Sequence, residues 1–479
     1  NKPPASSSKF WCFLYVLIVG WIVFLFSFHY LSLQPLTNND QNTSQEPTNT
    51  AVAEPLPSKT LRINPVTTPN TSKQVALKEP ATDDDLIHIV FSTDCSFFQD
   101  WQTLLVFHSA MVIHQKGKIT RIASGCSEDK QKELNSLYAT LFPQYRVHFT
   151  PDFKTDGKTK KKYDFYNKPY GLHHWLLNAK PSIPEHTVIV LLDPDMILLR
   201  PFTLNFANNT LNIFMDGYDL KKEHLPSKLG RGYPAAQLYG LGAPWATDRP
   251  HKHFNRREIC GDGSPCLNVK QRFGELHYSV GPPYLVEKND MLRITQSWTD
   301  FVPKVYSNYP ELLAEMYAYS MAAAHQDLPH YTLIHYMVSN VDVDEEGWKY
   351  IDVFNDDVCE EPVNGIFYPN HDLPNVLHHC QFFRSGEYGF QKRRIRKSIF
   401  QCDQPMMAHL PKDLGKNRFK NRDGEIIKMG PKASRRNAFM LCTIHRAINA
   451  MVRYYKSKMC QDASFVNHNE TINLVAMKY

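Results

Sequence analysis

Two aspartates, Asp193 and Asp195, stand directly after a run of apolar residues, VIVLL, at positions 188–192. An apolar run of this length with β-branched residues predicts a buried strand, and ligands of open α/β sheets bind beyond the carboxyl ends of such strands. Carboxylate oxygens suit Mg²⁺ and Mn²⁺, which bridge diphosphates. The pattern therefore predicts a divalent metal site, where the cation would neutralise charge on a departing nucleoside diphosphate.

The same Asp-x-Asp pattern also occurs at Asp83/Asp85 and at Asp342/Asp344. Short motifs arise by chance, so their structural context decides what they mean. The first of these pairs follows a polar segment, and the second lies among acidic neighbours, where a solvated turn is the simpler interpretation. The pair at 193 and 195 alone ends an apolar strand, and a strand-end turn without metal is its alternative.

Four further residues could take part in the same chemistry, and each has a plainer interpretation. Glu315, on a predicted helix, could face a sugar ring or orient an acceptor, or could be a salt-bridge partner. His378, next to His379, could complete a metal shell or be a structural histidine. Asp94 could contact a nucleotide or cap a helix, and Lys168 could contact phosphate or be solvated.

The elements that must position these residues alternate between strand and helix, which favours a parallel sheet. After them, the stretch 217–283 is rich in Gly, Pro, His and Arg and has little periodicity, which is typical of a functional or mobile segment. Two later helices are expected at 310–325 and 434–458. The earlier strands are expected at 86–92, 119–124, 145–150 and 187–192, and the earlier helices at 101–115, 133–141 and 166–179.

The first 85 residues are expected to lie outside this globular part. Residues 10–33 contain no Asp, Glu, Lys or Arg and are long enough to cross a bilayer as one helix. Lys2 and Lys9 precede this run and the next basic residue is Lys59, so the positive-inside rule predicts a cytosolic tail at 1–9 and a type II anchor. A cleaved signal peptide is the alternative. Residues 34–85, rich in Pro, Thr, Asn and Ser, predict a disordered, flexible stem.

The remaining chain divides into a lumenal domain at 86–462 and a tail at 463–479. Sequons for N-glycosylation at Asn42, Asn70, Asn208 and Asn469 agree with a lumenal position. Nine cysteines lie outside the predicted span, so pairing in an oxidising lumen leaves one over. Cys260 and Cys266 bracket a Gly-rich loop that a disulfide between them could close.

The charge of the chain excludes one class of partner. There are 54 basic and 48 acidic residues, and the formal net charge is +6 over 479 residues. Proteins that bind nucleic acid usually have a strongly basic domain. The balance here therefore predicts no nucleic-acid partner.

Several sequence blocks resemble the plant and algal peptidyl serine α-galactosyltransferases and the related hydroxyproline O-arabinosyltransferases. Together they cover most of the predicted lumenal domain. They are IHIVFSTDC at 87–95, DWQT at 100–103, ITRIASG at 119–125, YNKPYGL at 166–172, DPDMILLRP at 193–201, VGPPYLVEKNDM at 280–291, AEMYAYSMAAAH at 314–325, LHHCQFF at 377–383 and FQCDQP at 400–405.

The resemblance implies an α/β, GT-A-like glycosyltransferase domain with a mixed, mainly parallel central sheet. It also implies a single-pass type II protein of the Golgi or ER membrane, a UDP-sugar donor bound near Asp94 and Lys168, and a divalent metal, Mn²⁺ before others, at Asp193 and Asp195. His378 falls where the family has a histidine before an aromatic residue, Cys and Gln. His379 here replaces the aromatic residue, so which of the two histidines could bind metal stays open.

The implied reaction is transfer with retention, of galactose or arabinofuranose, to Ser or hydroxyproline (Hyp) of a Hyp-rich protein. Retention needs either a front-face departure assisted by the diphosphate or a carboxylate nucleophile, and Glu315 is the candidate for the second role. The alternative from another class is a non-catalytic lumenal protein that binds glycans or Hyp-rich peptides, which the aromatic content of 12% also suits.

Overall fold

The computed structural model describes residues 83–215, 225–247, 254–356, 358–359, 368, 371–416, 418–421, 423–426, 429–461 and 471–472. The predicted cytosolic tail and membrane anchor lie outside the described residues, as do nearly all of the stem and tail and three sequons, at Asn42, Asn70 and Asn469. Within the described part, no helix has both the length and the apolar character that crossing a membrane requires.

The described part begins in a short 3-10 helix, η1 (Asp83–Leu86), slightly before the predicted boundary at residue 86. Asp84 fixes this turn, because its Oδ1 accepts hydrogen bonds from Thr203 Oγ1 and the Leu204 amide, each at 2.9 Å. The Asp83/Asp85 pair therefore flanks a structural contact.

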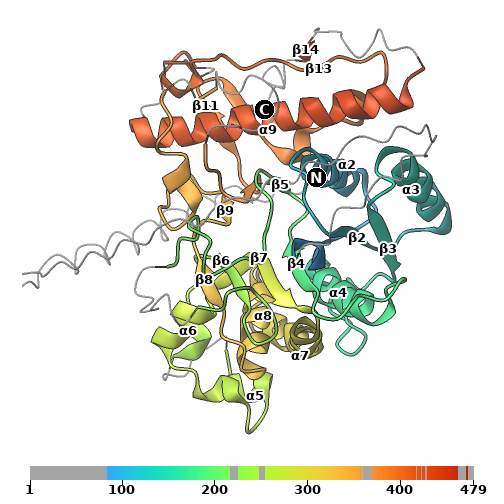
Figure 1. Ribbon diagram of the computed structural model, residues 1–479, viewed down its shortest axis with the longest axis vertical. Coiled ribbons are helices and arrows are strands. Elements are labelled where there is room, and N and C mark those ends of the chain that lie inside the picture. The colour runs from blue at the N-terminus through green and yellow to red at the C-terminus, as the bar shows by residue number, and fades with distance from the viewer. Residues whose placement is uncertain are drawn as a thin grey trace, which may run out of the picture. The chain divides into compact units, whose positions relative to one another are not determined.

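A seven-stranded sheet forms the centre of this unit, with strand order β3-β2-β1-β4-β7-β6-β8 (Figure 1). The first four strands in this order are parallel to one another. β7 runs antiparallel to both of its neighbours, and β8 is parallel to β6. The predicted mixed, mainly parallel α/β sheet is confirmed. Its strands are β1 (Ile87–Thr93), β2 (Lys118–Ser124), β3 (Arg146–Thr150), β4 (Val188–Leu192), β6 (Ala235–Leu238), β7 (Val280–Glu287) and β8 (Tyr331–Leu333).

Helices cover both faces of the sheet (Figure 1). One core contains Ile89 and Phe91 of β1 together with apolar residues of α2 (Phe97–Val112), α3 (Glu128–Leu141) and α9 (Pro431–Met459). The other contains Val90 of β1 together with residues of α4 (Asn167–Asn178), α7 (Lys288–Asn308) and α8 (Ala314–His325). Because successive side chains of a strand point to opposite faces, a strand buried on both faces is often continuously apolar, as β4 is.

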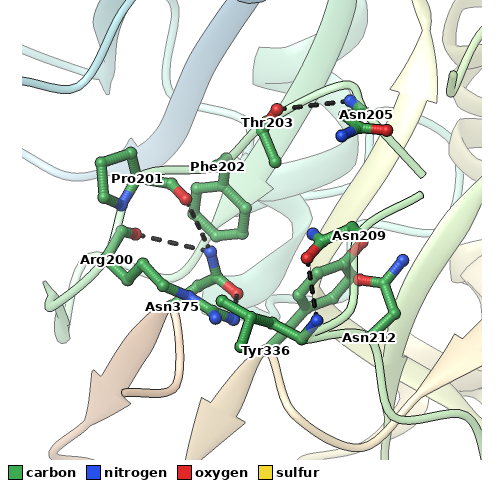
Figure 2. Close-up of a pocket in the computed structure, with 10 residues that line it drawn as sticks. Arg200, Pro201, Phe202, Thr203, Asn205, Asn209, Asn212, Tyr336 and Asn375 are labelled. Carbon is green, nitrogen blue, oxygen red and sulfur yellow. Dashed lines mark hydrogen bonds between the residues drawn. The ribbon is translucent and has the colours of Figure 1, made fainter. Parts of the chain in front are cut away.

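A second, three-stranded sheet of order β5-β10-β9 adjoins this core. β5 (Met196–Leu198) follows β4 after two aspartates and a proline, β9 is Met337–Val338, and β10 (Val376–His378) pairs antiparallel with β5. At one end of this pair His378 lies opposite Met196, and at the other Asn375 contacts Arg200, as Figure 2 shows. The two ends of this short pair carry different polar clusters.

Smaller elements complete the C-terminal region. β11 (Phe383–Ser385) and β12 (Tyr388–Phe390) form a hairpin, and β13 (Met406–Met407) pairs with β14 (Thr471–Ile472) from the predicted tail. The 3-10 helices after η1 are η2 (Asp164–Tyr166), η4 (Pro244–Ala246), η5 (Pro265–Asn268), η6 (Gly347–Tyr350), η7 (Lys392–Arg394), η8 (Lys397–Phe400) and η9 (Leu414–Lys416).

The prediction of an irregular stretch at 217–283 was wrong for much of its described part. It contains β6, α5 (Arg256–Cys260), α6 (Gln271–His277) and the first residues of β7. Gly281-Pro282-Pro283 is typical of a turn in sequence, yet these residues are buried in β7 between β4 and β6. Tertiary pairing overrides the local preference here.

Several helix boundaries also differ from the predictions, including the start of α2, which begins at Phe97 and not at residue 101. α3 begins at Glu128, because Ser127 caps it by accepting a hydrogen bond from the Lys130 amide, and its first turn is too polar for apolar periodicity to detect. α8 begins at Ala314, after the Pro310 at which a start was predicted.

Among the described residues, eight of the nine cysteines form four disulfides and Cys380 forms none. The odd number of cysteines predicted a residue left over, and the predicted bridge around the Gly-rich loop is confirmed. The pairs are Cys95–Cys126, Cys260–Cys266, Cys359–Cys442 and Cys402–Cys460.

Candidate active site

The two sheets meet at Asp193 and Asp195. All five residues of β4 are buried, and the strand ends at the first aspartate. The backbone then enters β5. Its partner strand β10 brings the ring of His378 to Asp195, where His378 Nε2 lies 3.1 Å from Asp195 Oδ1. A backbone hydrogen bond also joins the two segments here, because the His379 amide donates to the Asp195 carbonyl at 3.0 Å.

Asp193, Asp195 and His378 form a group that could hold a metal ion. Each offers one ligand atom, and these atoms all lie within 4.8 Å of one another. Two carboxylates and one imidazole are an accepted ligand set for divalent cations. The structure thus brings together the three residues predicted as metal ligands, at the carboxyl edge of the sheet.

Opposite charges surround Asp195, which is 6% exposed. Burial opposes its ionisation, but His378 and Lys392 outweigh burial and hold the pKa of Asp195 well below its usual value. Burial likewise opposes the charged form of His378, yet its contacts with Cys380 and Asp195 raise the pKa of His378 well above the ordinary histidine value. His378 and Lys392 thus supply positive charge beside Asp195, and ligation of a cation by His378 would require its ring to release a proton.

Lys168 links the metal-site edge to Glu315. Its ammonium lies 2.7 Å from Asp193 Oδ1 and 3.3 Å from Glu315 Oε1. Burial works against the charged ammonium, but Asp193 and Glu315 together raise the pKa of Lys168. In this structure Lys168 therefore binds carboxylates, and Glu315 is the salt-bridge partner that one sequence interpretation expected.

Glu315 itself lies in the first turn of α8 and is 2% exposed. Its carbonyl accepts a hydrogen bond from Trp298 Nε1 at 2.8 Å, and its amide donates to the Tyr163 hydroxyl at 3.2 Å. Burial and the charge of Asp193 raise the pKa of Glu315 to about 7, against the opposing effect of Lys168. The backbone of Glu315 is thus fixed on both sides, and its carboxyl group has a pKa near neutrality.

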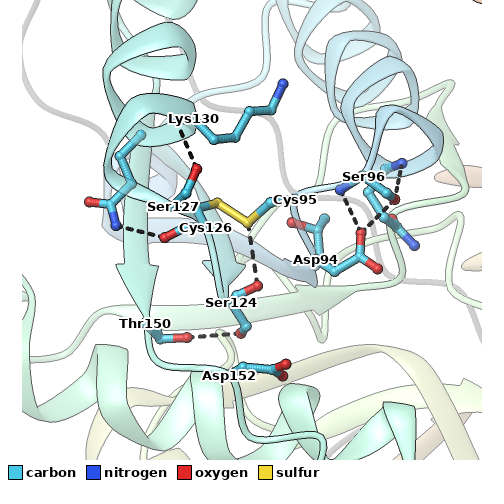
Figure 3. Close-up of a disulfide and its surroundings, with 12 residues drawn as sticks. Asp94, Cys95, Ser96, Ser124, Cys126, Ser127, Lys130, Thr150 and Asp152 are labelled. Carbon is cyan, nitrogen blue, oxygen red and sulfur yellow. Dashed lines mark hydrogen bonds between the residues drawn. A yellow bond between two sulfur atoms is a disulfide. The ribbon is translucent and has the colours of Figure 1, made fainter.

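Asp94 lies in the loop directly after β1 and forms local hydrogen bonds (Figure 3). Its Oδ1 accepts hydrogen bonds from the Ser96 amide at 2.9 Å and the Ser96 hydroxyl at 2.6 Å, and its Oδ2 lies 3.4 Å from Lys154 Nζ. Because β1 and β4 are parallel neighbours, Asp94 stands at the same edge of the sheet as Asp193. Ser96 is the residue that caps α2, and Asp94 bonds to this cap residue instead of capping the helix itself. Nucleotide binding by Asp94 stays a prediction.

A disulfide holds this edge together. Cys95–Cys126 joins the loops that follow β1 and β2, and Thr150 Oγ1 at the end of β3 donates to Ser124 Oγ at 2.8 Å (Figure 3). The carboxyl ends of three neighbouring strands are therefore linked by side-chain contacts beside the loop that carries Asp94.

The structure separates the two adjacent histidines. His378 belongs to the aspartate cluster, whereas the buried ring of His379 stacks on Trp101 with centroids 5.6 Å apart. Burial lowers the pKa of His379 to about 3, and its ring nitrogens form no hydrogen bond to other described residues. His379 thus packs as an aromatic ring in the core, away from the aspartate cluster.

Two residues of the site were missed by the sequence analysis. The Lys392 ammonium, in η7, forms an ion pair with Asp195 Oδ2. Tyr239 lies with its hydroxyl 3.4 Å from His378 Nδ1, and burial raises the pKa of Tyr239 well above its usual value. Lys392 belongs to a basic run, KRRIRK, whose sequence does not distinguish Lys392 from its neighbours. Tyr239 lies in the stretch that was predicted to be irregular.

Comparison with known proteins gives relatives but no matching family model. The chain is similar to two peptidyl serine alpha-galactosyltransferases. The relative from Chlamydomonas reinhardtii is 23% identical over 327 residues, which are 64% of this chain and 36% of that protein. The relative from Arabidopsis thaliana is 29% identical over 248 residues, 51% of this chain and 27% of that protein. The chain thus spans about a third of the length of these relatives, and the resemblance seen in its sequence blocks is confirmed.

Two solved glycosyltransferase structures overlap weakly with this fold. The galactosyltransferase LgtC, in complex with donor and acceptor sugar analogues, has a TM-score of 0.33 at 10% identity, over 61% of this chain and 87% of LgtC. The bifunctional WbbM has a TM-score of 0.31 at 11% identity, over 64% of this chain and 47% of WbbM. Overlaps this small carry no functional argument.

Proposed function

We propose that this chain is a metal-dependent, retaining glycosyltransferase. It moves galactose or arabinofuranose from a UDP-sugar to Ser or hydroxyproline of a Hyp-rich protein. The observation that carries the proposal is the Asp193, Asp195 and His378 cluster at the carboxyl edge of a mixed α/β sheet, in a chain similar to two peptidyl serine alpha-galactosyltransferases.

The three clustered side chains would hold the cation, Mn²⁺ in our proposal, which when bound neutralises negative charge on the leaving diphosphate. Lys168 and Lys392 each pair with one of the two aspartates, so they orient both carboxylates and add positive charge where the diphosphate of the donor would bind. Asp94, at the same sheet edge, is our candidate for contact with the nucleotide.

Glu315 is our candidate for the carboxylate that acts on the transferred sugar. It is buried, and one lysine side chain separates it from Asp193. Action as a nucleophile requires an ionised carboxylate. Lys168, which favours that form against burial, is therefore its positioning residue.

The proposed setting is the lumen of the Golgi or ER, with residues 10–33 as a type II anchor. The four disulfides support an oxidising compartment, since such bridges are rare in the cytosol. Asn208 is exposed, as a glycosylation site must be. We also propose that the described α/β domain is a GT-A-like glycosyltransferase domain.

The test is a transfer assay on the full chain, with UDP-galactose and UDP-arabinofuranose as donors and a Ser-Hyp-Hyp peptide as acceptor. We expect transfer with Mn²⁺, loss of transfer on chelation, and loss in Asp195→Asn. The matched control is Asp342→Asn, which alters an exposed Asp-x-Asp aspartate and must leave transfer intact. Full activity in Asp195→Asn contradicts the assigned site.

Calorimetry separates this proposal from the non-catalytic alternative. A glycosyltransferase must bind UDP in the presence of Mn²⁺, and the binding must weaken in Asp195→Asn. Binding of the Hyp-rich peptide without any binding of UDP would favour a protein that only recognises glycans or peptides.

A further inference from the structure

A second polar cluster lies at the opposite end of the β5–β10 pair from the aspartates (Figure 2). It lines a cavity of about 90 Å³. Asparagine side chains dominate the lining, the rings of Phe202 and Tyr336 form part of the wall, and Arg200 is the one charged residue among the described residues around it. The asparagines are Asn205, Asn209, Asn212 and Asn375.

Arg200 is held in place at this cavity without a carboxylate partner. Its Nη2 donates to Asn375 Oδ1 at 3.1 Å, and its guanidinium lies over the Tyr350 ring at 5.6 Å from the centroid. Its Nη1 is buried and has no hydrogen-bond partner in the described part of the chain. Asp372 acts on Arg200 electrostatically but forms no ion pair with it among the described residues.

A largely buried guanidinium is normally paired with an acid, because leaving such a charge unpaired is costly. Burial accordingly lowers the pKa of Arg200. Arg200 is also fixed rather than free to turn into solvent, since Asn375 is itself buried and donates to the carbonyls of Arg200 and Pro201. No carboxylate among the described residues contacts the guanidinium, so a bound anion would supply the charge that pairs with it.

The chemistry of the lining selects the ligand. A guanidinium binds carboxylate and phosphate oxygens with parallel hydrogen bonds, and asparagine amides add neutral donors. A water molecule takes about 30 Å³ in the liquid, so the cavity suits a small group rather than a whole nucleotide. We propose that the Arg200 cavity is a second ligand site, which takes a small oxyanion: a phosphate or a carboxylate group.

This site is separate from the proposed donor site. Val376 pairs with Leu198 at the Arg200 end of the two strands, and His378 pairs with Met196 at the aspartate end. Strands advance about 3.3 Å per residue, so the length of β5 keeps the two clusters apart. The inference does not depend on the proposed transferase activity.

The experiment measures the melting temperature of the full chain in increasing phosphate or acetate, at constant ionic strength set with chloride. We expect a saturable rise with at least one oxyanion, since a ligand that binds the folded state stabilises it. A rise with phosphate alone identifies a phosphate site, and a rise with acetate identifies a carboxylate site. If neither anion raises the melting temperature in the millimolar range, the proposal is wrong.

Two variants locate the binding. Arg200→Gln must abolish the rise, because it removes the guanidinium. Lys392→Gln removes a cation beside Asp195 and must leave the rise unchanged. The opposite pattern, with the rise lost in Lys392→Gln and kept in Arg200→Gln, assigns the anion to the aspartate edge and overturns the proposal.

Hydrogen exchange on the unaltered chain covers the case in which Arg200→Gln does not fold. The anion that raises the melting temperature must slow amide exchange across residues 199–212, and exchange in β2 is the internal reference. Stabilisation without slower exchange in that segment places the ligand elsewhere and rejects this site.

Discussion

Oδ1 of Asp195 lies 3.1 Å from Nε2 of His378, although 183 positions of sequence separate the two residues. The antiparallel register of β5 and β10 creates this contact, because it places His378 opposite Met196. The candidate metal site is thus built from the end of the central sheet and from a strand that belongs to the C-terminal region.

Changing His378 to Gln should weaken Mn²⁺ binding. Loss of partners in the outer shell of metal sites already costs about 10–100-fold in affinity, so loss of a ligand should cost at least about tenfold. Titration of Mn²⁺ by electron paramagnetic resonance measures the change. The matched control is His379→Phe, which keeps an aromatic ring on Trp101 and should bind Mn²⁺ as the unaltered chain does. Equal losses in both variants would remove His378 from the proposed metal shell.

Changing Lys168 to Met should destabilise the fold as well as reduce transfer. The variant leaves Asp193 and Glu315 without the buried ammonium between them, and breaking a buried ion pair costs about 3–5 kcal/mol. Urea unfolding measures the loss. Adding Glu315→Gln to Lys168→Met should restore part of the stability, since it removes the carboxylate left without a partner. Additive losses would mean that Lys168 and Glu315 do not interact energetically.

Acid should destabilise the protein below pH 6.5, in part through His108. Burial lowers the pKa of His108 to about 4. Between the unfolded pKa near 6.5 and this folded value, the unfolded state binds more protons, so the free energy of unfolding falls as the pH falls. From pH 6.5 to 5, one such histidine contributes a loss of about 2 kcal/mol.

His108→Phe should reduce that pH dependence by about the same amount, because phenylalanine does not titrate. Urea unfolding at pH 7.5 and pH 5 measures it, and His409→Gln, at an exposed histidine, is the control. An unchanged slope in His108→Phe would show that the pKa of His108 is the same in the folded and unfolded states.

Removing the Cys95–Cys126 disulfide should cost more stability than removing Cys260–Cys266. The first closes a loop of sequence separation 31 and the second one of 6, for which loop-closure entropy gives about 4 and about 2 kcal/mol. Paired Cys→Ala variants and urea unfolding test the order. The first pair should also weaken UDP binding, because it joins strand ends beside Asp94. Unaltered UDP affinity would show that the strand ends joined by Cys95–Cys126 are not part of the donor site.

The parts of the fold predicted from sequence were those with strong local patterns. The apolar runs of β1 and β4 and the helical spacing in α2 and α4 reflect burial on known faces, so they can be seen without the structure. β7 was not predicted, because its Gly-Pro-Pro is typical of turns and its position between β4 and β6 depends on distant partners. The helix α7 was also missed, and Pro303 interrupts its sequence pattern.

Some residues of the candidate site were likewise predictable from the sequence, and others were not. Asp193 and Asp195 were marked by the strand that they end, whereas His378 was one of two adjacent candidate histidines and is placed by the β5–β10 register. Lys392 carries no local signal, because its contact with Asp195 depends on where a loop lies in the folded chain. Residues fixed by periodicity were predictable, and residues fixed by long-range contacts were not.

The cluster of Asp193, Asp195 and His378 depends on β10, and this dependence matters while the chain is being synthesised. A nascent chain that has emerged only as far as β8 carries both aspartates but not the imidazole, and it also lacks α9, which packs against α2 over one face of the sheet. The complete ligand set therefore forms only after translation has passed residue 378. Under the proposed function, the metal would therefore bind late in biogenesis, and a polypeptide that ends before β10 would lack one of the three proposed ligands.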